Sequence, residues 1–144
     1  MNASPQIVVV DANVCAKVFL EEENADKARA LFSSNVLAVA PDFIAVEVGS
    51  VFRKKILDHS MTEADALLAL EQVPTLVRLQ SSARLAPMGL AIALTHRRSF
   101  YDSLYVALAV QESCEFVTGD DRLINSIGQY YPGTFRRLLD LPSP

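Results

Sequence analysis

The feature that most constrains the fold is the run Gln6-Ile-Val-Val-Val10, which is apolar throughout after Gln6. A segment expected to form a helix, 14–20, follows soon after it. Such a run is typical of a strand buried on both faces, as found in parallel sheets covered by helices. Strands alternating with helices predict an α/β fold with a mainly parallel sheet. Further strands are expected at 36–40, 75–79, 116–117 and 135–139, and helices at 14–20, 25–32, 41–57, from Thr62, 83–95, 101–112 and from about Asp120.

Size and composition favour one globular domain spanning residues 1–144. The chain is 51% hydrophobic and 21% charged, which is the balance of a protein that buries a core. It contains no run of roughly 20 apolar residues that would cross a bilayer, and no basic segment that would open a signal peptide. Cys15 and Cys114 have no metal-ligand or disulfide pattern. We therefore expect free thiols and a cytoplasmic protein without a membrane partner.

The net charge of −4 and the pI of about 5.1 count against nonspecific binding of nucleic acids. The basic residues are nevertheless clustered, at 53–55, 97–98 and 136–137. Each cluster is explained simply as a solvated helix face or strand end. The clusters matter for RNA only if the fold brings them round a common cleft.

Two acids stand out from the pattern of apolar residues. Asp11 directly follows the first strand, where it can cap the next helix or bind a ligand at the sheet edge. Asn13 can play a similar part, or orient Asp11 by a hydrogen bond. Glu47 lies on the margin of an apolar helix stripe, where a charge is costly unless it is paired. A metal ion, or an arginine such as Arg53 or Arg84, would provide that pairing.

Two further acids lie at predicted helix starts. Ser99 and Asp102 have the spacing of a capping box, so capping alone can explain Asp102. Thr118 and Asp121 repeat this spacing at the next helix start. Asp121 therefore has a structural explanation that Asp120 lacks, and Asp120 is the predicted ligand.

If Asp11, Glu47, Asp102 and Asp120 converge, their mutual repulsion becomes the largest electrostatic effect. Two like charges 4 Å apart cost about 4 kcal/mol at an effective dielectric constant of 20, and a whole domain is stable by only about 5–15 kcal/mol. A divalent cation, or protonation of one acid, is then required. Oxygen ligands favour Mg²⁺ or Mn²⁺, which activate water for hydrolysis of phosphodiesters.

Four segments together resemble the PIN-domain ribonucleases, in particular the small toxins of VapBC toxin–antitoxin systems. They are Val8–Asn13, Pro41–Glu47, Tyr101–Ala109 and Val117–Leu123. The resemblance implies a PIN-like three-layer fold, in which helices flank a five-stranded parallel sheet. It also implies Mg²⁺- or Mn²⁺-dependent endoribonuclease activity, a homodimer and a small antitoxin whose tail blocks the cleft.

By resemblance, Asp11, Glu47 and Asp102 correspond to the three core acids of the family. Asp120 corresponds to the fourth, with Thr118 and Asn13 as polar helpers and Asp121 as an additional acid. Two alternatives are a non-catalytic PIN-like scaffold and a PIN nuclease of RNA processing without an antitoxin. A phosphoacceptor signalling domain does not fit, because Ala12 follows Asp11 and no lysine follows Lys55.

Overall fold

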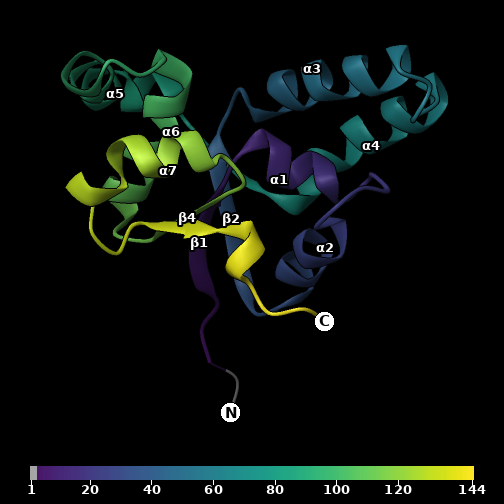
Figure 1. Ribbon diagram of the computed structural model, residues 1–144, viewed down its shortest axis with the longest axis horizontal. Helices are drawn as coiled ribbons and strands as arrows, with labels where there is room; N and C mark the ends of the chain where they lie inside the picture. Colours follow the sequence, from purple (N-terminus) through teal and green to yellow (C-terminus); the bar gives the residue numbers. More distant parts are fainter. Residues whose placement is uncertain (1–2) are drawn as a thin grey trace.

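The chain forms a parallel five-stranded sheet in the order β3-β2-β1-β4-β5, as seen in a computed structural model that describes residues 3–144 (Figure 1). The predicted α/β class and parallel sheet are therefore confirmed. The strands are β1 (Gln6–Val10), β2 (Val36–Pro41), β3 (Arg78–Gln80), β4 (Glu115–Thr118) and β5 (Phe135–Arg137).

The central position of β1 follows from its sequence. Val8, Val9 and Val10 are all buried, so both faces of the strand are covered. β1 pairs with β2 on one side and with β4 on the other. A strand in this position needs apolar side chains on both faces, which explains its lack of polar alternation.

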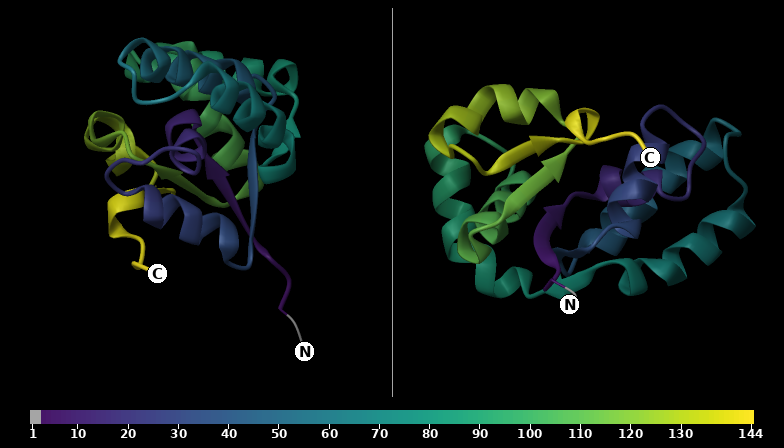
Figure 2. Two further views of the ribbon diagram at one scale, coloured as in Figure 1. Left: turned by 90° about the vertical axis from the view of Figure 1, so that its right-hand side faces the viewer. Right: turned by 90° about the horizontal axis from the view of Figure 1, so that it is seen from below.

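Helices flank the sheet on both sides. Figure 1 shows α5, α6 and α7 on one side of the strands and α2, α3 and α4 on the other, and the view from below in Figure 2 (right) shows the same separation. No helix of residues 3–144 is both long and apolar enough to cross a membrane. The helices are α1 (Ala12–Lys17), α2 (Ala25–Ser33), α3 (Ile44–Leu57), α4 (Glu63–Leu76), α5 (Ser82–His96), α6 (Phe100–Glu112) and α7 (Asp121–Ile127), with 3₁₀ turns η1 (Gly128–Tyr130) and η2 (Leu138–Asp140).

The predicted start of the third helix at Pro41 is wrong. Pro41 ends β2, where it pairs in register with Gln80 of β3, and α3 begins only at Ile44. Proline lacks a backbone N–H, which is tolerated at the end of a strand as well as at the start of a helix. The sequence therefore left both positions open, and the pairing with β3 decided between them.

Three predicted boundaries also move. Residues 75–76 extend α4 past Pro74, so β3 starts at Arg78 and the strand predicted at 75–79 is mostly wrong. The first helix begins at Ala12 rather than residue 14, because Asp11 caps it. The last strand ends at Arg137, where η2 begins. By contrast, Thr62 caps α4 as predicted, since its Oγ1 accepts a hydrogen bond from the Asp65 N–H at 3.1 Å.

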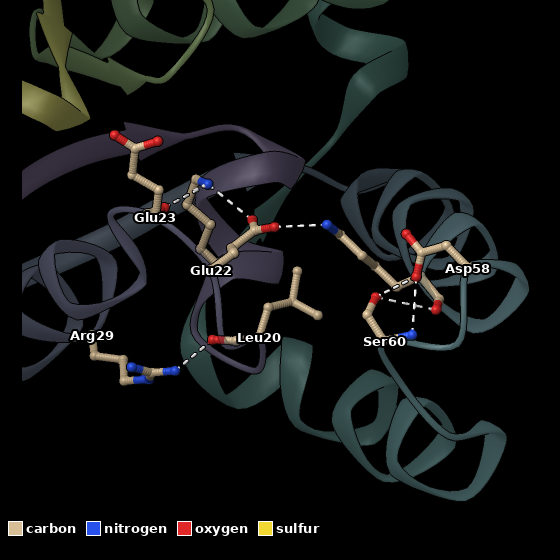
Figure 3. Close-up of polar contacts among 8 residues, drawn as sticks. Leu20, Glu22, Glu23, Arg29, Asp58 and Ser60 are labelled. Atoms are coloured by element: carbon tan, nitrogen blue, oxygen red, sulfur yellow. Dashed lines mark hydrogen bonds and ion pairs between the residues drawn. The ribbon is translucent and has the colours of Figure 1, made fainter.

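Helices α1 and α3 pack together and are joined by a charged bridge at Glu22 (Figure 3). The Lys17 Nζ of α1 lies 2.9 Å from Glu22 Oε1, and the Lys55 Nζ of α3 lies 2.7 Å from Glu22 Oε2. Burial raises the pKa of Glu22, but the hydrogen bonds from Lys55 and Lys17 outweigh it, so its pKa falls below the usual range. Glu22 is thus fully charged and fully paired.

Candidate acidic site at the carboxyl edge of the sheet

The carboxyl ends of β1 and β4 bring Asp11, Thr118 and Asp120 together. β1 and β4 are adjacent and parallel, with Val10 in register with Val117. The Thr118 hydroxyl donates a hydrogen bond to Asp11 Oδ2, and the Asp120 N–H donates to Thr118 Oγ1 at 3.0 Å. The buried threonine therefore couples the acid after β1 to the backbone beside the acid after β4.

Asp11 both caps α1 and forms part of this acidic edge. Its Oδ1 accepts a hydrogen bond from the Val14 N–H at 2.9 Å. Burial raises the pKa of Asp11 from 3.8 to about 6, the hydrogen bonds from Thr118 and Val14 oppose this rise, and the charges of Asp120 and Glu47 add to it. The two interpretations of Asp11 from sequence, capping and membership of an acidic site, are thus compatible.

Glu47 is paired with a tyrosine and not with an arginine. The Tyr105 hydroxyl donates a hydrogen bond to Glu47 Oε1 at 2.7 Å. The expectation that Arg53 or Arg84 neutralises Glu47 is wrong, because no ion pair found among residues 3–144 includes Glu47. Burial raises the pKa of Glu47, the Tyr105 hydrogen bond lowers it, and the charge of Asp102 raises it again.

Tyr105 is a site residue that the sequence did not single out. Its ring stacks on Phe116 of β4, with centroids 5.6 Å apart, and meets the ring of Phe43 edge-on. Because of this packing the buried side chain holds its hydroxyl beside Glu47. Its position three residues after Asp102, on the same helix face, was the available signal.

Asp102 completes the group on the side of α6. The Ser99 Oγ accepts a hydrogen bond from the Asp102 N–H at 3.0 Å, so capping occurs as predicted, but by Ser99 and not by the Asp102 side chain. The Asp102 carboxylate lies 3.5 Å from Arg98 Nη2 and acts electrostatically on Glu47. Asp102 is therefore shared between an ion pair with Arg98 and an electrostatic effect on Glu47.

Asp120, and not the Thr118–Asp121 pair, caps α7, so the predicted capping explanation for this helix start is wrong. Asp120 is the cap of α7, since its Oδ1 accepts a hydrogen bond from the Leu123 N–H at 3.1 Å. Asp121 lies in the first turn, is 65% exposed and forms an ion pair with Arg137 Nε at 3.1 Å. The Thr118 hydroxyl bonds to Asp11 and to the Asp120 N–H, so it does not cap at the predicted spacing. Asp120 therefore caps α7, and its charge also raises the pKa of Asp11.

Asn13 and His96 have no hydrogen bond to the acids among the described residues. Asn13 is exposed in the first turn of α1. His96, at the end of α5, lies with its Nε2 3.0 Å from the Tyr131 hydroxyl and its ring against Tyr130. His96 is therefore part of an aromatic cluster near η1.

The charges of Asp120 and Glu47 raise the pKa of Asp11, and the charge of Asp102 raises that of Glu47. Burial, and not mutual repulsion as expected, is the largest cause of the raised pKa values of Asp11 and Glu47. Within residues 3–144 no group of three or more aspartate, glutamate, histidine or cysteine side chains is arranged to hold a metal ion. The donor set still fits Mg²⁺ or Mn²⁺, because these ions take oxygen ligands and Mg²⁺ keeps several of its waters, so one or two carboxylates suffice.

The comparison with protein families decides the identity of the fold. The family described as "PIN domain" matches residues 8–127, which include all four acids. The chain belongs to the PIN-domain family. This PIN domain is 37% identical over 91 residues to Ribonuclease VapC1 of Mycobacterium tuberculosis, an alignment that covers 62% of this chain and 67% of that protein.

Solved structures confirm the PIN fold. The structure of PAE2754 from Pyrobaculum aerophilum superimposes with a TM-score of 0.69, at 18% identity, over 94% of this PIN domain and 92% of that chain. VapC20 of Mycobacterium tuberculosis, described as a toxin that cleaves the sarcin–ricin loop, gives a TM-score of 0.60 at 17% identity, over 77% of this chain and 86% of that one.

Proposed function

We propose that this PIN domain is an endoribonuclease that uses a divalent metal ion, and that it acts as the toxin of a VapBC-type toxin–antitoxin pair. The relatives named as ribonucleases support the reaction. The observation that carries the proposal is the pair Asp11 and Glu47, two partly buried carboxylates that have no cationic partner among residues 3–144. Buried charges are normally paired or bind metals.

In the proposed site, Mg²⁺ or Mn²⁺ is held by Asp11 and Glu47, with Asp102 and Asp120 as the outer acids. A bound ion of this kind supplies a water of lowered pKa for attack on the phosphorus of an RNA phosphodiester. The protein's own contribution is to fix the acids in place. The Thr118 hydroxyl and the Val14 N–H hold the two oxygens of Asp11, and the Tyr105 hydroxyl holds Glu47.

Asn13 and Asp121 are proposed as supporting groups at the rim. Both are exposed, Asn13 two residues after Asp11 and Asp121 one residue after Asp120. The remaining parts of the proposal follow from the toxin role. The partners are an RNA substrate, a small cognate antitoxin and a second copy of the chain in a homodimer, and the whole chain works as one domain in the cytoplasm.

The test compares the wild type, Asp11→Asn and Asp26→Asn on a panel of structured and unstructured RNAs, with Mg²⁺, Mn²⁺ or EDTA. Asp26 is a matched control, because it is an exposed aspartate in the first turn of α2. We expect metal-dependent cleavage by the wild type and Asp26→Asn, and loss of cleavage in Asp11→Asn. Equal cleavage by Asp11→Asn would point to a contaminating nuclease and refute the proposal.

The toxin role has a separate test. The neighbouring reading frame is expected to encode a short antitoxin that binds this chain and inhibits cleavage. Cleavage without such a neighbour would favour a nuclease of RNA processing, and no cleavage of any RNA would favour a non-catalytic scaffold.

A further inference from the structure

An acidic nuclease has to overcome repulsion between its own carboxylates and the phosphates of RNA. The chain carries a net charge of −4, and the acids at the carboxyl edge of the sheet would repel an approaching strand. Binding of nucleic acids normally depends on arginine and lysine contacts to phosphate. Positive groups close to the acidic site are therefore needed, and the sequence contains two arginine pairs, 97–98 and 136–137.

The structure brings one member of the second pair to the site. Arg137 ends β5, in register with Thr118 of β4, which bonds to Asp11. Arg137 forms an ion pair with Asp121, and its Nη2 donates a hydrogen bond to the Asn125 side chain at 3.2 Å. Two residues of α7 thus hold the guanidinium beside the Asp120 end of the acidic group, and the side chain remains 38% exposed.

Its neighbour Arg136 lies on the opposite face of the same strand. Successive side chains of a strand point to opposite faces. Arg136 accordingly lies 3.5 Å from Glu115, the first residue of β4, at the end of that strand remote from the acids. Its side chain is 41% exposed, close to the value for Arg137.

The two arginines of the first pair, Arg97 and Arg98, also differ in their partners. Arg98 Nη2 lies 3.5 Å from Asp102 Oδ2, at the other end of the acidic group. Arg97 is exposed, has a left-handed backbone conformation after α5, and has no ion pair among those found in residues 3–144. Arg98 and Arg137 therefore form ion pairs with Asp102 and Asp121, whereas Arg97 and Arg136 form no ion pair with the acids of the site among the described residues.

We propose that Arg98 and Arg137 bind RNA phosphate groups on the two sides of the acidic site, so that the strand crosses the acids from one arginine to the other. This inference rests on the proposed function. The hydrogen bond from Tyr105 of α6 to Glu47 places the first turns of α6 beside α3, and Arg98 pairs with Asp102 there. Asp11 and Asp120 meet at the ends of β1 and β4, and Arg137 lies beyond them on the edge strand β5, where it pairs with Asp121.

The chemistry of the guanidinium group fits this role. It carries five N–H donors in a planar fork that matches phosphate, and Arg137 uses Nη2 for Asn125, which leaves the donors of Nη1 for a ligand. The Nε atoms of Arg98 and Arg137 are buried and have no hydrogen-bond partner of good geometry among the described residues. The aspartate partners are 37% and 65% exposed, and exposed ion pairs contribute little stability. A phosphate can therefore replace them at small cost.

The experiment measures RNA binding in the Asp11→Asn background, where cutting is prevented. The probe is a fluorescent single-stranded RNA that the wild type cleaves, and binding is followed by anisotropy from 50 to 200 mM salt. Arg98→Gln and Arg137→Gln are each expected to weaken binding about tenfold. Each should also lower the slope of log affinity against log salt by about 0.7, the value for one lost phosphate contact on single-stranded RNA. Arg97→Gln and Arg136→Gln, which remove the same charge, should leave both quantities unchanged.

Cleavage kinetics and a conservative variant separate binding from structural damage. In the wild-type background, Arg137→Gln is expected to raise KM with little change in kcat. Arg137→Lys should regain part of the affinity, because it keeps the charge, and all variants are checked by thermal melting. Equal effects within each arginine pair, or an unchanged salt slope, would overturn the proposal while leaving the nuclease function intact. A wild type that cleaves no RNA would instead refute the function on which it rests.

Discussion

Glu22 and Glu47 are both partly buried glutamates, yet their pKa values are shifted in opposite directions. Glu22 receives Lys17 and Lys55, and its pKa is lowered. Glu47 receives only the Tyr105 hydroxyl, and its pKa is raised. Glu22 links α1 and α3 through its two lysine partners. Glu47, by contrast, interacts electrostatically with two other acids, Asp11 and Asp102.

The difference separates a structural acid from one that is available for chemistry. A carboxylate with two internal cations is already neutralised and has no need of an external one. Asp11 and Glu47 have no cationic partner among the described residues, so their charges favour protonation or the binding of a cation from solution. The arrangement of partners, and not the residue type, therefore distinguishes the two regions.

The largest expected effect is on activity. Glu47→Gln should lower kcat/KM for RNA cleavage at least a hundredfold, because it removes a carboxylate that is held in place to bind the metal. Glu22→Gln, the matched change in the other region, should lower it less than about threefold. A quenched fluorescent RNA measures both rates. Similar losses in the two variants would remove the distinction between the regions.

Metal binding should stabilise only the acidic edge. At a Mg²⁺ or Mn²⁺ concentration of about 100 times Kd, the wild type should gain about 2.7 kcal/mol, or a rise in Tm of about 5–10 °C. The same rise is expected in Glu22→Gln, whose lysines do not bind cations, and no rise in Asp11→Asn. Differential scanning fluorimetry measures these shifts. An equal rise in Asp11→Asn would place the metal elsewhere.

Stability without metal should increase as the pH falls from 7 to 5. The pKa of Asp11 is about 6 in the folded chain and 3.8 in the unfolded one, so its contribution is complete below about pH 4 and is lost as the pH rises through 6. Between pH 7 and pH 5 the expected gain from this group is about 1 kcal/mol. Urea unfolding in EDTA measures it, as the difference between wild type and Asp11→Asn. An identical pH dependence in the two proteins would show that Asp11 is not buried as described.

The smallest expected effect comes from the tyrosine. Tyr105→Phe keeps the ring between Phe43 and Phe116 but removes the hydrogen bond to Glu47, at a cost of about 1 kcal/mol in the free energy of unfolding. Because that hydrogen bond lowers the pKa of Glu47, the acidic limb of the pH–rate profile should move to higher pH. An unmoved profile would show that the hydroxyl does not tune Glu47.

Much of the acidic site could be predicted from the sequence, because strand ends can be located from local patterns. The valines before Asp11 fix the position of that acid at the end of a buried strand, and a parallel sheet collects such ends at one edge. The partners of the acids could not be predicted. Tyr105 is 58 residues from Glu47, and Thr118 is 107 residues from Asp11.

The tertiary structure also decided which of two neighbouring residues of the same type occupies a given position. Asp120 and Asp121 are chemically identical and both fit a helix start, and the sequence alone favoured a Thr118–Asp121 capping box over capping by Asp120. The Thr118 hydroxyl bonds to Asp11, across from β1, and α7 then begins after Asp120. In the same way, nothing local distinguishes Arg136 from Arg137, and only the strand register places Arg137 beside Asp121.

The sequence by itself determined the α/β class, the central strand and the candidate acids, because hydrophobic periodicity and the residues at strand ends are local properties. The tertiary structure decided which acids are neutralised. Glu22 meets two lysines and Glu47 meets a tyrosine only after the helices pack. Electrostatic partners are set by distances across the fold, and these distances exist only once the sheet has assembled.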